Sequence, residues 1–169
     1  MCLQGVLMRQ TLLQNEDVKR KTIDHLDVEI LNVLQKDCRL SFNKVATEAQ
    51  ISVGTAYNRI KSLETRDYVK GYRVLVDSTK MGFPLTAVIF VQAEGGHLPD
   101  VEKEIAHRSN VAAVYDITGE FDAVVVAKFR GREDLNVFIK QLASMVQVKR
   151  TITSVSLNIV KEDFRIPLA

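Results

Sequence analysis

The chain has 169 residues, of which 46% are hydrophobic and 26% are charged, with 23 Lys and Arg against 21 Asp and Glu. This composition is that of an ordinary globular protein and excludes a disordered, collagen-like or coiled-coil chain. The longest apolar runs are far shorter than the ~18 to 20 residues of a membrane span, and residues 1–8 lack the features of a secretory signal. Cys2 and Cys38 are too few for a disulfide framework or a zinc site. We therefore expect a cytoplasmic protein with no membrane contact.

The near-zero net charge of +2 hides a weak asymmetry between the two halves of the chain. Residues 1–83 carry 13 Lys and Arg against 10 Asp and Glu, whereas residues 84–169 carry 10 against 11. The excess is strongest in residues 51–76, where five cations face only Glu64 and Asp67. A local excess of positive charge in a balanced protein suggests a surface for an anionic partner.

The first half of the chain has helical periodicity. Apolar residues from position 23 to position 34 recur at three- and four-residue spacing, which predicts a first helix with Asp24 or Thr22 as its N-cap. A short second helix is expected from Ser41 through residue 49.

A third helix is expected after a tight turn at residues 50 and 51. Ser52 is its predicted N-cap, and the helix extends from residue 53 to about residue 65. Residues 68–76 are rich in β-forming side chains around Gly71, which predicts a β-hairpin or wing.

After residue 84 the pattern changes to strand, helix and strand, and this unit occurs twice. Two such units predict a four-stranded antiparallel sheet with both helices on one face, the ferredoxin-like βαββαβ arrangement, so the fold class is α+β. The expected strands are residues 85–93, 111–118, 122–129 and 146–160, and the expected helices contain residues 98–105 and 135–142.

Both faces of the predicted sheet are apolar. Along the first strand Ala87 and Ile89 point one way, whereas Val88 and Phe90 point the other way. Because the helices cover only one face, we expect a second subunit to bury the other, giving a homodimer that can assemble to a tetramer or octamer.

The helix-turn-helix of residues 41–65 is the most specific signal for function. Such a motif places the N-terminal turns of its second helix in the major groove, where short polar residues and flanking cations contact the DNA. The alternative is an ordinary three-helix bundle with a solvated polar face. The candidate residues for binding double-stranded DNA are Ser41, Ser52, Thr55, Tyr57, Asn58, Arg59, Lys61, Lys70 and Arg73.

Several stretches of this chain resemble, in the same order, parts of the Lrp/AsnC (feast/famine) transcriptional regulators. Residues 114–122 resemble that family's central turn of glycine, acid, aromatic and aspartate, and residues 151–153 its threonine pair on the last strand. The resemblance covers about residues 22–165 and implies a winged helix-turn-helix followed by a ligand-sensing domain. The N-terminal stretches that carry it are residues 23–31, 34–39, 51–64 and 69–72.

Two positions depart from the family pattern, which often has glycine there. Cys38 follows the first helix, and Asp67 precedes the predicted wing. Glycine adopts a left-handed backbone at little cost, Asp tolerates it better than most residues, and Cys tolerates it less well. We therefore expect the helix ends at these positions to be strained or shaped differently.

The resemblance also implies an amino-acid effector site between subunits. Gly119 lets the backbone approach a ligand closely, and Asp122 can pair with an α-ammonium group. The alternative is a simple β-turn in which Glu120 is solvated and Asp122 bonds to the backbone. The candidate effector-binding residues are Tyr115, Gly119, Glu120, Asp122, Thr151 and Thr153.

The sequence thus predicts a DNA-binding transcriptional regulator and not an enzyme, with an amino acid as effector and without catalytic residues, metal or cofactor. One alternative is an enzyme resembling sirohaem decarboxylases, which have a similar two-domain body. Another is an effector-binding assembly protein that binds DNA weakly. The expected division is a leader, 1–21, a winged helix-turn-helix domain, 22–77, a linker, 78–84, and a ligand-sensing and oligomerisation domain, 85–169.

Overall fold

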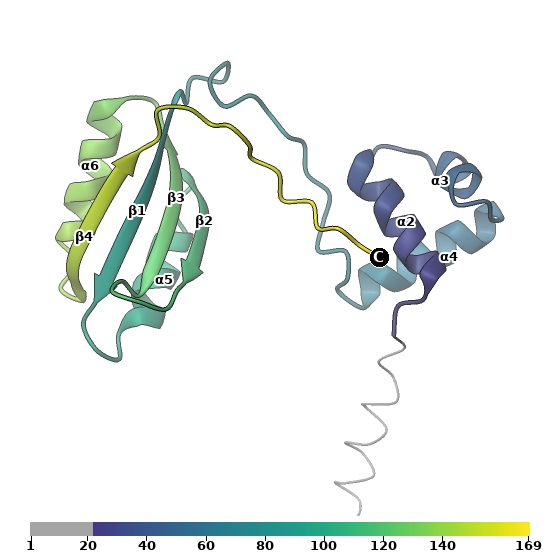
Figure 1. Cartoon of the computed structure of the whole chain (residues 1–169), viewed down its shortest axis with the longest axis horizontal. Coiled ribbons are helices and arrows are strands. Elements are labelled where there is room, and N and C mark those ends of the chain that lie inside the picture. The colour runs from purple at the N-terminus through teal and green to yellow at the C-terminus, as the bar shows by residue number, and fades with distance from the viewer. Residues whose placement is uncertain (1–21) are drawn as a thin grey trace, which may run out of the picture. The chain divides into compact units, whose positions relative to one another are not determined.

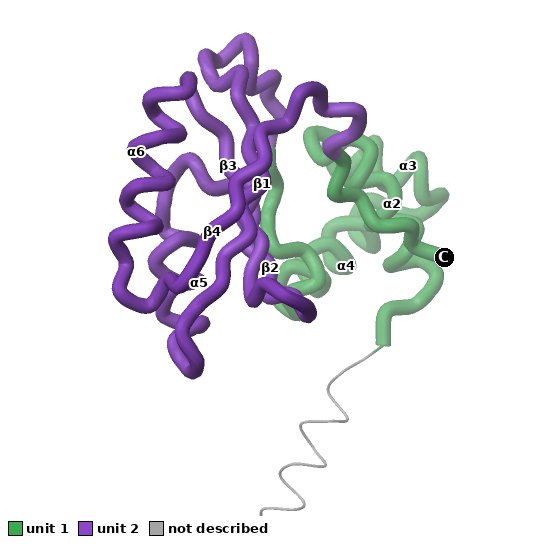
Figure 2. The backbone as a smooth tube through the Cα atoms, turned by 60° about the vertical axis from the view of Figure 1, so that its left-hand side comes forward, with its two compact units in different colours: residues 1–73, 163–169 green, residues 74–162 purple. Residues whose placement is uncertain are grey.

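The computed structural model describes residues 22–169, and the expected leader and Cys2 lie outside this range. Two compact units make up the described chain (Figure 2). Unit 1 contains residues up to Arg73 together with Asp163–Ala169, and unit 2 is Val74–Glu162. The last seven residues, which the sequence pattern assigns to the second domain, therefore belong to the first unit.

The described residues of unit 1 form the helices α2 (His25–Lys36), α3 (Phe42–Glu48) and α4 (Val53–Thr65) (Figure 1). The side chains of Asp24, Ser41 and Ser52 each accept a backbone N–H three residues later. Asp24 and Ser52 are thus the N-caps that the sequence predicts, and Ser41, expected as the first residue of its helix, is its N-cap. Asp27 also accepts the Asp24 N–H and so completes a capping box. The buried side chains that hold the helices together are Ile30, Leu34, Val45, Ala49, Ile60 and Leu63.

The C-terminal residues of the chain bond to α2. Gln35 exchanges two hydrogen bonds with the backbone of Ile166, donating to its carbonyl at 3.2 Å and accepting its N–H at 3.0 Å. Asn32 donates to the Leu168 carbonyl at 3.3 Å. These contacts explain why Asp163–Ala169 belongs to unit 1.

The turn between α3 and α4 has a left-handed residue at Gln50, with φ of 54°. The Gln50 N–H donates to Thr47 O at 3.2 Å and the Ile51 N–H donates to Ala46 O at 2.9 Å, so this geometry ends α3. A left-handed conformation costs a residue with a Cβ about 1–2 kcal/mol, whereas glycine adopts it freely but loses more chain entropy on folding.

Gln50→Gly is therefore expected to raise the free energy of unfolding by about 0.5–1 kcal/mol, because the strain that is relieved exceeds the added entropy cost. Denaturant unfolding followed by circular dichroism measures this change. Gln50→Ala is the matched control, since it removes the same exposed side chain and keeps the strained Cβ. A glycine variant no more stable than the alanine variant would contradict the assignment of strain.

The prediction of a β-hairpin at residues 68–76 is wrong, because no strand is found between α4 and residue 85. An isolated two-stranded hairpin is marginal in water, and the described residues of unit 1 contain no third strand. Val74, Leu75 and Val76 are exposed by 82%, 88% and 65%. Apolar β-forming residues therefore follow α4 without a sheet to join.

Of the two positions where the family pattern has glycine, only one has the left-handed backbone. Asp67 has φ of 59° and ends α4 as the resemblance implies, whereas Cys38 does not have a positive φ. The helix end at residue 38 is instead shaped by Asp37, which accepts the Arg39 N–H and ion-pairs with its guanidinium at 3.1 Å. Cys38 is a free, half-buried thiol.

Unit 2 is a single antiparallel sheet with two helices on one face (Figure 1). The strand order is β2-β3-β1-β4, which confirms the ferredoxin-like prediction. The last strand is shorter than the predicted 146–160. The elements are β1 (Leu85–Ala93), α5 (Leu98–Ala106), β2 (Val111–Asp116), β3 (Ala123–Phe129), α6 (Arg132–Ala143) and β4 (Val148–Val155).

The register of the strands separates the two faces of the sheet. Ile89 of β1 lies opposite Val125 of β3, and both are fully buried in the core with residues of α5 and α6. On the other face Phe90 lies opposite Val124 of β3 and Ile152 of β4, and all three side chains are only partly covered. We call this second surface the open face, defined by Val88, Phe90, Val124, Val126 and Ile152.

Candidate DNA-binding and effector sites

Helix α4 has one buried and one exposed face. Ala56, Ile60 and Leu63 are buried. Tyr57, Asn58 and Lys61 are exposed, as predicted from the sequence pattern. Because residues advance by about 100° along a helix, Asn58 lies nearly opposite the buried stripe. The exposed face of α4 therefore presents a phenol, a carboxamide and an ammonium group together.

The two candidate serines serve as helix caps. Ser52 Oγ accepts the Thr55 N–H at 3.1 Å and shares a hydrogen bond with Thr55 Oγ1 at 2.8 Å. Ser41 Oγ accepts the Lys44 N–H at 3.4 Å. These bonds fix the first turns of α4 and α3, the turns that a helix-turn-helix presents to DNA.

Arg59 points to α2 and not to the exposed face of α4. Its Nη1 donates to both carboxylate oxygens of Asp24 at 2.7 Å and to Asp27 Oδ1 at 2.8 Å. Only 29% of the Arg59 side chain and 8% of the Asp27 side chain are exposed. The hydrogen bond from Arg59 lowers the pKa of Asp24, and the hydrogen bond to Asp24, then that to Asp27, raises the pKa of Arg59.

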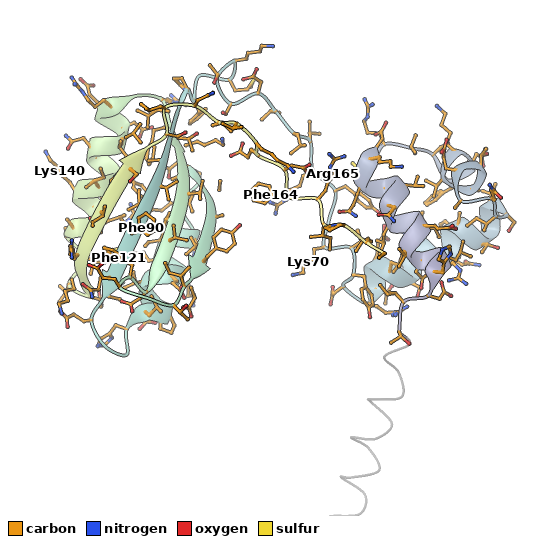
Figure 3. The ribbon with its side chains drawn as sticks, in the orientation of Figure 1. Lys70, Phe90, Phe121, Lys140, Phe164 and Arg165 are labelled. Carbon is orange, nitrogen blue, oxygen red and sulfur yellow. The ribbon has the colours of Figure 1, made fainter. Side chains whose placement is uncertain are left out.

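Lys61 belongs to a second network, which joins α4 to the segment after it. Lys61 Nζ lies 2.7 Å from Glu64 Oε2, and the Tyr72 hydroxyl donates to Glu64 Oε1 at 3.0 Å. Burial and the Glu64 hydrogen bond raise the pKa of Tyr72 to about 12. Lys70 and Arg73, on either side of Tyr72, are exposed, and Figure 3 shows Lys70 on this segment.

Phe42 contacts the aromatic candidate on α4. Its ring packs edge-on against Tyr57, with ring centroids 5.2 Å apart. Phe42 and the two carboxylates around Arg59 are residues that the sequence reasoning did not assign to this surface. Their contacts join different helices, so no local pattern identifies them.

The predicted effector turn lies between β2 and β3. Asp122 Oδ2 accepts the Ala93 N–H at 2.9 Å, and the Asp122 N–H donates to Val91 O at 3.0 Å. Asp122 therefore joins the turn to the end of β1. This bond uses Oδ2 of the carboxylate and does not use Oδ1. Gly119 has φ of 129°, and a Cβ placed there would meet no atom within 4 Å, so the turn is open to a ligand on that side.

Arg150 and Gln92 also belong to this end of the sheet, although the sequence reasoning missed them. Arg150 Nη1 lies 3.1 Å from Glu120 Oε1, and its guanidinium carbon lies 5.4 Å from the centre of the Phe121 ring. Gln92 donates to the Glu120 carbonyl at 3.3 Å. Phe121 in turn packs against Phe90, with centroids 5.6 Å apart (Figure 3).

The remaining effector candidates lie on different faces of the sheet. Thr151 and Thr153 on β4 face Val91 and Ile89, so they share the helix-covered side. Tyr115 lies opposite Val124 and is on the open face. Since β2 and β4 are the two edges of the sheet, one chain does not bring Tyr115 to the threonines.

The described chain thus combines a helix-turn-helix with a separate α+β domain, the organisation of a ligand-responsive transcriptional regulator. Residues 23–64 match the AsnC-type helix-turn-helix domain, and residues 86–166 match the Lrp/AsnC ligand-binding domain. The chain belongs to the Lrp/AsnC family and is a transcriptional regulator.

Known relatives support this assignment over nearly their whole length. An HTH-type transcriptional regulator of Pyrococcus furiosus is 46% identical over 144 residues, covering 85% of this chain and 97% of the relative. The regulator FL11 of the same organism is 26% identical over 149 residues, covering 88% and 99%.

Solved structures share the fold. A transcriptional regulator of Neisseria meningitidis, crystallised with L-methionine, has a TM-score of 0.81 and 26% identity over 87% of this chain and 97% of that one. AsnC of Escherichia coli has a TM-score of 0.77 at 20% identity, covering 88% and 99%. No helix within residues 22–169 has the length and apolarity to cross a membrane. The same residues contain no cluster of three or more His, Cys, Asp or Glu suited to a metal.

Proposed function

We propose that this regulator binds double-stranded DNA through α4, responds to an amino acid at the β2–β3 turn, and acts as a homodimer or an assembly of dimers. The observation that supports DNA binding best is the exposed face of α4. It carries Tyr57, Asn58 and Lys61, while the opposite face is buried in unit 1.

A carboxamide such as that of Asn58 can bond to the edge of a base, and the exposed cations Lys70 and Arg73 can contact phosphates. In a dimer the two α4 helices would contact half-sites one turn of DNA apart, on the order of 34 Å, or a multiple of that distance. An effector that binds one assembly state better than another would shift this spacing, which links effector and DNA binding.

A salt series tests the DNA-binding proposal and separates it from an assembly protein with weak DNA binding. A protein that neutralises several phosphates must lose affinity steeply as salt rises, because the bound counterions of DNA are released on binding. Fluorescence anisotropy with labelled duplexes selected in vitro from random DNA measures this slope. A slope near zero would exclude α4 and its flanking cations as a DNA-binding surface.

The proposal of an amino-acid effector rests on the chemistry of the β2–β3 turn. The Asp122 carboxylate suits an α-ammonium group, and the open side of Gly119 allows an α-carboxylate to approach the backbone N–H groups. The Neisseria regulator crystallised with L-methionine supports the same ligand class. A thermal-shift screen of the twenty amino acids identifies the ligand, since binding to the folded state raises its stability.

We propose regulation and not catalysis as the activity of this chain, and a cytoplasmic location. A protein resembling sirohaem decarboxylases would bind a tetrapyrrole and absorb in the Soret region. Adding a tetrapyrrole to the purified protein and recording that region therefore tests the alternative. A bound tetrapyrrole together with no retention on a DNA column would favour the enzyme.

The open face is the proposed dimer interface. A charge on this face should prevent association, because it would be buried without a partner. Ile152→Glu, opposite Phe90, is therefore expected to give the mass of one chain in light scattering at micromolar concentration, where the wild type gives at least two. Val137→Glu on α6, an exposed apolar position outside the open face, is the control. An unchanged mass for Ile152→Glu would place the interface elsewhere.

A further inference from the structure

The Arg59 ion-pair cluster, defined as Arg59 with Asp24 and Asp27, joins two helices that are far apart in sequence. All three hydrogen bonds come from a single nitrogen, Nη1, at 2.7, 2.7 and 2.8 Å. The partners lie 35 and 32 residues before Arg59, at the start of α2. Asp24 is also the N-cap of α2 and Asp27 completes its capping box, so both carboxylates are fixed by backbone bonds.

The place of Arg59 on α4 favours this inward contact. With about 100° per residue, Arg59 lies roughly 60–70° from the centre of the stripe formed by Ala56, Ile60 and Leu63, whereas Asn58 lies almost opposite it. Arg59 is thus on the flank of the buried face, where a long side chain reaches the neighbouring helix. The exposed carboxamide of Asn58 is on the side that would meet a groove.

The charge of the cluster also argues against a contact with phosphate. Two carboxylates surround one guanidinium, so the cluster as a whole carries one negative charge. A guanidinium held by two carboxylates offers little attraction to a DNA phosphate, and moving it would leave the buried Asp27 without its partner.

We propose that Arg59 is a positioning residue. It sets the rotation of α4 against α2, so that Asn58 faces the base edges, and it does not itself bind a phosphate. This inference deepens the proposed DNA binding and rests on it. Loss of the Arg59 side chain should therefore reduce the discrimination between DNA sequences while leaving the number of phosphate contacts unchanged.

The test compares Arg59→Met with Lys61→Met in the full-length protein. The probes are a duplex selected from random DNA by the wild type and a scrambled duplex of equal length and composition. Anisotropy titrations at several salt concentrations give the affinity ratio of the two duplexes and the salt slope. Thermal unfolding followed by circular dichroism identifies a temperature at which both variants are folded, and the titrations are made at that temperature. Lys61 is the matched control, because its ion-pair partner, Glu64, lies on the same helix.

For Arg59→Met we expect the ratio of the affinities for the selected and scrambled duplexes to fall about tenfold or more. The salt slope should stay at the wild-type value. For Lys61→Met we expect similar losses on both duplexes and a slope smaller by about 1. Arg59→Lys should retain most of the discrimination, since one ammonium group can replace the single nitrogen that makes all three bonds. A slope reduced by Arg59→Met, or an unchanged affinity ratio in the folded variant, would overturn the proposal.

Asp24→Asn gives an independent measurement should Arg59→Met fail to fold, because asparagine remains a good N-cap. If Arg59 positions α4, this variant loses discrimination and gains no affinity. If Arg59 instead binds phosphate in competition with Asp24, the variant binds both duplexes more tightly, which overturns the proposal. Failure of the proposed function itself would differ, since the wild type would then show no salt-dependent DNA binding at all.

Discussion

Asn58→Ala is expected to weaken binding to a selected DNA duplex by about 5- to 150-fold, which corresponds to the ~1–3 kcal/mol of a bidentate contact between a carboxamide and a base. Asn58 is exposed and lies opposite the buried stripe of α4, so its removal disturbs no packing. Because a base contact carries sequence information, the loss on a scrambled duplex should be much smaller.

Asn136→Ala is the control for this prediction, since it makes the same change at an exposed position on α6 in unit 2. It should leave both affinities at the wild-type value. Equal losses for Asn58→Ala on selected and scrambled duplexes would show that Asn58 contacts the DNA backbone. No loss on either duplex would remove the exposed face of α4 from the interface.

Asp122→Asn is expected to weaken binding of the effector amino acid by about 10- to 150-fold, the ~1.5–3 kcal/mol of a hydrogen bond to a charged group. The asparagine oxygen can still accept the Ala93 N–H that Asp122 accepts at 2.9 Å, so the turn keeps its anchor to β1. The variant therefore removes the negative charge offered to an α-ammonium group without removing the structural bond.

Isothermal calorimetry with the amino acid found in the thermal-shift screen measures this effect. Asp116→Asn serves as the control, because it removes an exposed carboxylate at the end of β2 that is not among the candidate effector-binding residues. If both variants weaken binding equally, the site responds to net charge and not to a specific contact with Asp122. Wild-type affinity for Asp122→Asn would remove this residue from the site.

The elements of the fold were predictable because their signals are local. Asp24, Ser41 and Ser52 start helices in the structure as their sequence pattern predicts, since a cap and the N–H that it accepts are only three residues apart. The strands followed from alternation and apolar runs. The hairpin predicted at residues 68–76 does not form, because its β-forming residues find no third strand within residues 22–73 with which to pair.

The candidate sites depend on contacts that no local pattern contains. Arg59 is a DNA-binding candidate from the sequence because it is a cation on the second helix of the motif. Its carboxylate partners are 32 and 35 residues away. The pairing of Asp122 with Ala93 N–H, at a separation of 29 residues, is of the same kind. Sequence therefore indicated which residues are chemically suited to a site, and only the tertiary contacts show how each is held.

The bonds between α2 and the end of the chain have a practical consequence for dissecting this regulator. A fragment that stops at residue 73 would contain α2, α3 and α4 but would lack the segment around Ile166 that exchanges two hydrogen bonds with Gln35. The DNA-binding unit is thus assembled from both ends of the described chain. Its affinity and melting temperature should be measured in full-length protein, because a truncated domain would lack part of its own structure.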